Sequence, residues 1–187
     1  MPGFGDRSAR LLIIGLAPAA HGANRTGRVF TGDRSGDFLF ASLHRCGFAN
    51  QPECVSLGDG LTLSDAYIAA AVRCAPPANK PSLDERDRCR AFLVRELALL
   101  RKVRAIVVLG AFAYDATWTA LRDAGIDLPA RRAKFAHLMQ QCAGPYTVVG
   151  SYHPSQQNTF TGRLTEPMLD DVWDAARAIC DNRLGRA

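Results

Sequence analysis

The chain has 187 residues, of which 48% are hydrophobic and 22% are charged. That is enough apolar material for one core, so we expect a single domain over residues 1–187. Lysine and arginine outnumber aspartate and glutamate by 23 to 18, and the formal net charge of +5 is compatible with an anionic partner. No apolar run approaches the ~20 residues of a membrane helix, and the N-terminus lacks a signal-peptide pattern. We therefore expect a cytoplasmic protein without membrane contact.

A long loop after the first apolar run is the most informative segment. Residues 11–16 are apolar and partly β-branched, which is typical of a strand buried on both faces. The loop from Gly15 to Asp33 is rich in Gly, Asn and Arg, and Asp33 and Ser35 stand where the N-cap of a helix belongs. A loop that leaves the carboxyl end of a parallel strand and leads into a helix is the usual ligand position in open α/β sheets.

The remaining chain alternates between strand patterns and helix patterns. Further strands are expected at residues 67–72, 105–109 and 147–152, and helices at 35–46, 82–102, 111–124 and 166–182. This alternation predicts a three-layer α/β/α sandwich with a central, mainly four-stranded parallel sheet. Residues 123–145 show no clear period, so we expect a loop with at most a short strand there; its cationic and titratable side chains are Arg131, Arg132, Lys134 and His137.

A second loop with functional character follows the fourth strand. It reads Gly150-Ser-Tyr-His-Pro-Ser-Gln-Gln-Asn-Thr-Phe-Thr-Gly-Arg163. A residue before proline is held extended, so His153 is expected to point from the strand end into the crevice at the sheet edge. A lone histidine is more often structural than catalytic. Two loops that leave the sheet on the same edge nevertheless favour a functional site.

The six cysteines form no pattern that indicates a metal site or a disulfide framework. There is no CxxC pair among Cys46, Cys54, Cys74, Cys89, Cys142 and Cys180. Cys74 and Cys89 flank a proline-containing turn that becomes a helix at Ser82. From the residues alone, two structural thiols are favoured over a metal site, because a closed site usually takes four ligands.

Three segments together resemble the signature regions of the uracil-DNA glycosylase superfamily, and most closely those of its fifth, b-type family. They are the first loop, the turn Val72-Arg-Cys-Ala-Pro-Pro-Ala-Asn-Lys-Pro81 and the His153-Pro-Ser155 loop, and they occur in the family's order over nearly the whole chain. The resemblance implies a monofunctional DNA repair enzyme. Such an enzyme flips uracil out of uracil-containing DNA and hydrolyses its N-glycosidic bond, which leaves an abasic site.

The resemblance also implies roles for pocket residues. Phe30 would be the aromatic platform under the flipped base, with ordinary core packing as the alternative. His153 would donate a hydrogen bond to a uracil carbonyl as a neutral imidazole. Gly15 and Ala17 would contact the substrate. Asn79 is the nearest amide that could read the uracil edge, because the second strand ends in alanines, although a turn asparagine is the alternative.

The residue that positions the attacking water is not fixed by the resemblance. Many relatives carry an acid or an amide early in the first motif, but this chain has Leu16-Ala17-Pro18 there. Asp33, Asn24 and His21 remain as candidates within the loop. We favour Asp33, because a carboxylate also stabilises an oxocarbenium-like sugar, and a helix N-cap role could coexist with that function.

The two loops also supply candidate contacts to DNA. Arg25, Arg28, Ser155 and Arg163 are expected to hold phosphates, and Phe160 or Arg163 would fill the space that the flipped nucleotide leaves. Two rivals stay open: a non-catalytic module that binds DNA lesions or nucleotides, and a nucleotide hydrolase. The hydrolase would require a divalent metal, for which no clustered carboxylates are evident.

The b-type resemblance also raises the question of iron. Members of that family often hold a four-iron cluster with four cysteines, two of which lie ahead of the first strand. Only Cys74 and Cys89 match those positions here. Two thiolates cannot close a cubane cluster, so we expect no iron-sulfur cluster, no other cofactor and no metal. We also expect a monomer.

Overall fold

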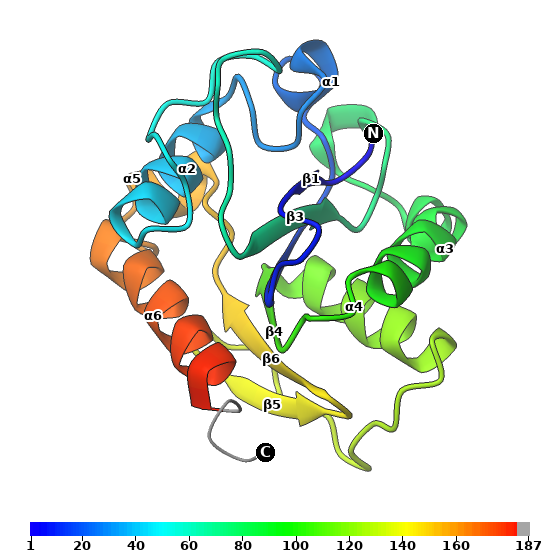
Figure 1. Ribbon diagram of the computed structural model, residues 1–187. Coiled ribbons are helices and arrows are strands. Elements are labelled where there is room, and N and C mark those ends of the chain that lie inside the picture. The colour runs from blue at the N-terminus through cyan, green and yellow to red at the C-terminus, as the bar shows by residue number, and fades with distance from the viewer. Residues whose placement is uncertain (183–187) are drawn as a thin grey trace.

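The computed structural model describes residues 1–182 and shows a six-stranded sheet with helices on both faces (Figure 1). The four central strands are parallel: β2 (Leu11–Gly15), β3 (Ala66–Ala70), β4 (Ala105–Leu109) and β6 (Tyr146–Ser151). The strand order is β1-β3-β2-β4-β6-β5. The predicted α/β sandwich around four parallel strands is therefore confirmed.

Two short antiparallel strands complete the sheet. Neither is among the four strands expected from the sequence. β1 (Phe4–Gly5) pairs with β3, and β5 (Gln140–Ala143) pairs with β6. β5 lies within residues 123–145, where the sequence showed no clear period and allowed at most a short strand. Its residues are mostly polar and partly exposed because it lies at the sheet edge, so it carries no apolar run that sequence could reveal.

The four expected helices cover the sheet in two pairs. α2 (Arg34–Arg45) and α6 (Glu166–Asn182) pack on one face, and α3 (Leu83–Leu99) and α4 (Ala111–Asp123) pack on the other (Figure 1). α3 begins after Ser82, whose hydroxyl accepts from the Glu85 backbone while the Glu85 carboxylate accepts from Ser82. This capping box explains why the helix starts where the sequence predicts it. Among residues 1–182 no helix is both long and apolar enough to cross a membrane.

The continuous apolar run of β2 follows from its burial on both faces. Leu11 and Ile13 join the core that contains Trp173 of α6, whereas Leu12 and Ile14 join the core that contains Trp118 of α4. Successive side chains of a strand point to opposite faces, so a central strand needs apolar residues at every position. Residues 183–187 of the predicted single domain lie outside the described part.

Three loops leave the same edge of the sheet because β2, β3 and β6 are parallel. They contain short helices that the sequence did not reveal: α1 (Ala23–Thr26), η1 (Pro77–Asn79) and α5 (Gln156–Phe160). Backbone pairing continues beyond the strand ends, where Ala71 N donates to Gly15 O at 2.9 Å and Val72 N donates to Leu16 O at 3.0 Å. These bonds hold the second loop beside the first.

Arg28 is buried and anchors the first loop, so the structure does not support the DNA contact expected of it. Its guanidinium donates to both carboxylate oxygens of Asp59 at 2.8 and 2.7 Å, and its Nε donates to Thr31 Oγ1. The side chain is almost completely buried and lies over the Phe4 ring. The pairing keeps the pKa of Asp59 well below its usual value. A guanidinium committed to this buried pair is not available to phosphates.

Candidate active site

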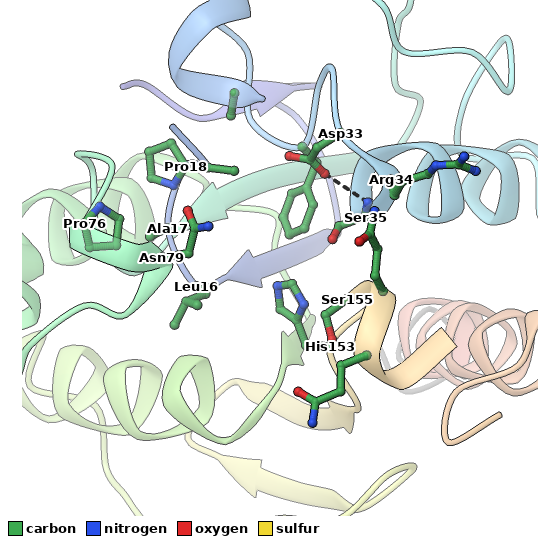
Figure 2. A pocket seen from close by; sticks show the side chains of 15 residues that line it. Leu16, Ala17, Pro18, Asp33, Arg34, Ser35, Pro76, Asn79, His153 and Ser155 are labelled. Carbon is green, nitrogen blue, oxygen red and sulfur yellow. Dashed lines mark hydrogen bonds between the residues drawn. The ribbon is translucent and has the colours of Figure 1, made fainter. Parts of the chain in front are cut away.

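A cavity of about 490 Å³ opens where the three loops meet at the carboxyl edge of the sheet. Its size lies in the range of small-molecule sites. Figure 2 shows Asp33, Asn79 and His153 on different sides of this pocket, each from a different loop. The lining residues are Leu16, Ala17, Pro18, Ala19, Ala23, Phe30, Asp33, Arg34, Ser35, Pro76, Asn79, His153, Ser155, Gln156 and Gln157.

His153 stands in the pocket wall that β6 provides. Asn158 Nδ2 donates to the His153 carbonyl at 2.8 Å and so fixes the backbone of the loop. The imidazole lies 5.9 Å from the Phe30 ring between centroids, and within residues 1–182 its nitrogens form no hydrogen bond. Burial lowers the pKa of His153 to about 4, and the Asp33 carboxylate opposes this shift. At neutral pH the ring is therefore uncharged, with one N–H donor and one acceptor for a ligand.

Phe30 is held in the pocket in a strained conformation. Its φ of 53° lies in the left-handed region, where a bulky residue costs about 1–3 kcal/mol. A Cβ on Gly15 would lie 2.5 Å from Phe30 Cε2, so the ring fits against β2 only because residue 15 is glycine. A Cβ on Gly36 would likewise collide with the Phe30 carbonyl. Glycines on both sides thus permit the position of this ring.

Gly15 therefore acts through Phe30. It is buried beneath the ring and is not among the lining residues, so the structure does not support the direct substrate contact expected of it. Ala17, by contrast, lines the pocket as expected.

Asp33 caps a helix with one carboxylate oxygen, and its other carboxylate oxygen forms no hydrogen bond among residues 1–182. Its Oδ1 accepts from the backbone N–H groups of Ser35 at 2.9 Å and Gly36 at 3.0 Å, which makes it the N-cap of α2. Its Oδ2 forms no hydrogen bond within the described residues and lies against Gly22, where a Cβ would collide with it. One oxygen is thus fixed by the helix while the other remains available to a ligand in the pocket.

Asn79 lies in the wall formed by the second loop. Ala78 and Asn79 have φ values of 51° and 55°, and the Asn79 backbone N–H donates to the Pro76 carbonyl at 3.2 Å. This tight turn presents the amide of Asn79 beside Pro76 in the pocket (Figure 2). In the part of the chain that is described, the side-chain amide has no hydrogen-bond partner, so it is free to bind a ligand edge.

The other two candidates for positioning water lie outside the pocket. His21 and Asn24 are exposed residues at the short helix α1, and neither lines the cavity. The helical turn directs this part of the loop to solvent, a local feature that the sequence did not signal. Of the three candidates, the structure brings only Asp33 into the pocket.

The four other residues that were expected to contact DNA lie in different surroundings. Ser155 lines the pocket, whereas Arg25 is exposed beside it and donates through Nε to the His21 carbonyl. Phe160 is 73% exposed at the end of α5, and the Arg163 guanidinium lies over the Tyr152 ring at 4.7 Å. These four residues remain accessible to a large ligand.

Four polar residues line the pocket although no pocket role was expected of them from the sequence: Arg34, Ser35, Gln156 and Gln157. All four lie in the first turn of a helix, directly after Asp33 or Ser155. Their place at a helix start facing a ligand loop is the signal that could have found them.

The two cysteines that match the family's cluster positions lie close together but do not fit a four-iron cluster. Cys89 Sγ accepts from the backbone N–H of Arg73, the neighbour of exposed Cys74. Among residues 1–182 no group of three or more His, Cys, Asp or Glu side chains could hold a metal ion. A cubane cluster requires four cysteines, so no step of the chemistry is derived through such a group.

The low pKa of His153 predicts a specific titration. In NMR spectra of the histidine ring, we expect His153 to protonate with a midpoint near pH 4, because burial disfavours the charged imidazole. Asp33→Asn should lower this midpoint further, since it removes the charge that opposes the shift. In the unfolded chain the same ring takes up its proton near pH 6.5. The free energy of unfolding should therefore decrease as the pH falls from about 6.5 toward 4, because in that range the unfolded chain binds the proton and the folded protein does not. A midpoint near 6.5 in the folded protein would contradict the burial described here.

Comparisons with known proteins agree with these features. The profile of the uracil DNA glycosylase superfamily matches residues 2–177. The chain is 50% identical over 181 residues to a type-5 uracil-DNA glycosylase of Mycobacterium tuberculosis, across 96% of this chain and 66% of that protein. It is 46% identical to the type-5 enzyme of Thermus thermophilus, across 96% of this chain and 80% of that protein, and 44% identical to that of Pyrobaculum aerophilum.

The chain thus spans about two thirds of the length of the mycobacterial relative. The family match extends over both the sheet and the loops that build the pocket, and the relatives carry the type-5 name that the resemblance to the b-type family implied. The chain belongs to the uracil-DNA glycosylase superfamily.

Proposed function

We propose that this chain removes uracil from DNA by hydrolysing the N-glycosidic bond, as a monofunctional, monomeric enzyme of the cytoplasm that leaves an abasic site. One observation carries the proposal. An uncharged, half-buried His153 faces the Phe30 ring and the Asp33 carboxylate in one pocket that is large enough for a flipped base. The relatives described above are all named uracil-DNA glycosylases, which supports the same reaction.

Each of these side chains supplies one requirement of the reaction. Phe30 offers a flat face for a base that has left the stack, and Asn79 offers an amide to its polar edge. Water adds to the sugar carbon as the bond to the base nitrogen breaks, and the bonding electrons leave with uracil. The N–H of His153 stabilises the charge that develops on a uracil carbonyl oxygen, by roughly 3–4 kcal/mol for one such donor. His153 acts here as the neutral imidazole, because burial disfavours the protonated, charged form of its ring.

The carboxylate oxygen of Asp33 that has no hydrogen-bond partner among residues 1–182 is suited to act on the attacking water and on the sugar. A carboxylate can orient the attacking water and also stabilise the positive charge that develops on the sugar. Its second oxygen is fixed by the N-terminus of α2, so the group is held in place before substrate arrives. The same proposal treats the Cys74 and Cys89 thiols as structural, and it requires no metal or cofactor held by the described residues.

Excision in the presence of a chelator separates this function from its rivals. Duplex DNA with one uracil is incubated with the protein and EDTA, and abasic sites are then cleaved and counted. We expect excision by the wild type and a loss of about 10²–10³ in the single-turnover rate for His153→Ala, as for other lost oxyanion donors. A non-catalytic binding module would bind this DNA without cleaving it. A metal-dependent nucleotide hydrolase would be inactive in EDTA, and undiminished excision by His153→Ala would remove the histidine from the mechanism.

Substitution of Asp33 can separate its two roles. Asparagine caps helices about as well as aspartate, so Asp33→Asn should change the free energy of unfolding by less than about 0.5 kcal/mol. It removes the charge, however, and should slow single-turnover excision by about 10²-fold or more. The matched Asp33→Ala variant should lose the same activity and about 1 kcal/mol of stability as well. If Asp33→Asn excises uracil at the wild-type rate, Asp33 is a helix cap only.

A further inference from the structure

We propose that residues 131–134 form a second phosphate-binding surface, which holds the DNA backbone beside the nucleotide in the pocket. The inference rests on the proposed function for the identity of the ligand. It concerns a segment with Arg131, Arg132 and Lys134 that no step of the proposed chemistry uses.

Hydrogen bonds place this segment at the same edge of the sheet as His153. It leads into β5, whose first residue pairs with Val149 near the carboxyl end of β6. The Tyr114 hydroxyl, one turn into α4, donates to the Ala133 carbonyl at 2.7 Å. Farther along, His137 Nδ1 accepts from the backbone N–H of Tyr152 at 3.3 Å, next to His153. The chain that leads from this segment into β5 therefore crosses the end of β6 beside the pocket loop.

An aromatic cluster joins the segment to the pocket loop. Tyr152 lies between Arg163, at 4.7 Å from its ring, and His137, whose ring stacks on it at 5.1 Å. Phe135 then contacts Tyr152 on one side and Tyr114 on the other, with ring centroids 6.5 and 5.7 Å apart. A continuous chain of ring contacts therefore links the segment 131–134 to the pocket loop that carries Arg163.

The backbone of this segment is fixed by hydrogen bonds, and two of its three cationic side chains form no ion pair within residues 1–182. Gln141 Nε2 donates to the Arg131 carbonyl at 2.7 Å, and Gln141 Oε1 accepts from Ala133 N at 2.8 Å, which clamps the backbone. Arg132 pairs with Asp115. The side chains of Arg131 and Lys134 are exposed and form no ion pair within residues 1–182.

These side chains line a hollow of about 580 Å³, together with Arg132, Ala133 and Gln141. Like charges that are gathered on a fixed backbone repel each other, and an anionic partner relieves that repulsion. A DNA strand provides phosphates at regular intervals along its length, and the pocket for its nucleotide opens at this same edge of the sheet. Charge and position therefore both favour the DNA backbone as the occupant.

The test compares the salt dependence of DNA binding for two double variants. Arg131→Gln with Lys134→Gln removes the proposed contacts, whereas Arg101→Gln with Lys102→Gln removes two exposed cations just before β4, at the opposite edge of the sheet. Affinity for a duplex with an uncleavable abasic-site analogue is measured at several salt concentrations. Each phosphate contact contributes about 0.9 to the slope of log affinity against log salt.

We expect the first double variant to shallow that slope by about 1.8 and the control variant to leave it unchanged. The single-turnover excision rate at saturating protein should be the same for both variants and the wild type, because neither touches the pocket. Equal slopes for the three folded proteins, verified by thermal melting, would overturn the proposal. If the wild type binds duplex DNA without excising uracil, the proposed function fails, and the slope comparison still decides whether residues 131–134 hold phosphates.

Discussion

The close approach of the Phe30 ring to β2 is the contact on which the pocket depends. The ring occupies the space that a side chain at Gly15 would fill, and Gly36 leaves room for the Phe30 carbonyl. Phe30 adopts a left-handed backbone there, which an ordinary loop would avoid. The strain persists because the first loop is fixed elsewhere, above all by the buried pair of Arg28 and Asp59. Rigid anchoring away from the pocket thus maintains an unfavourable conformation within it.

The chemistry of the pocket follows from this arrangement. His153 faces the Phe30 ring and is buried enough to remain uncharged, while Asp33 uses one oxygen to cap α2 and keeps the other free. An uncharged donor and a fixed carboxylate suit opposite ends of a glycosidic bond, because negative charge develops on the base and positive charge on the sugar. Both groups are held in place by the protein before substrate binds, Asp33 by the N-terminus of α2 and the backbone of His153 by Asn158.

Local sequence signals predicted the features that depend on neighbouring residues. The continuous apolar run of β2, the helix start at Ser82 and the Asp33 N-cap all involve residues a few positions apart. The expectations that the structure does not support have two origins, a contact between distant residues and an unpredicted local turn. Arg28 looked like a phosphate ligand because its partner, Asp59, lies 31 positions away. His21 and Asn24 looked like pocket residues because nothing in the loop sequence indicated the turn of α1.

A crystal structure of the protein with free uracil tests most directly whether this pocket binds uracil on the Phe30 ring, with His153 at its edge. We expect the uracil ring to stack on Phe30, with a carbonyl oxygen within hydrogen-bond distance of a His153 ring nitrogen and the polar edge toward Asn79. Uracil bound elsewhere, or a pocket in which the Phe30 side chain has left its place against Gly15 to pack in the core, would contradict this expectation.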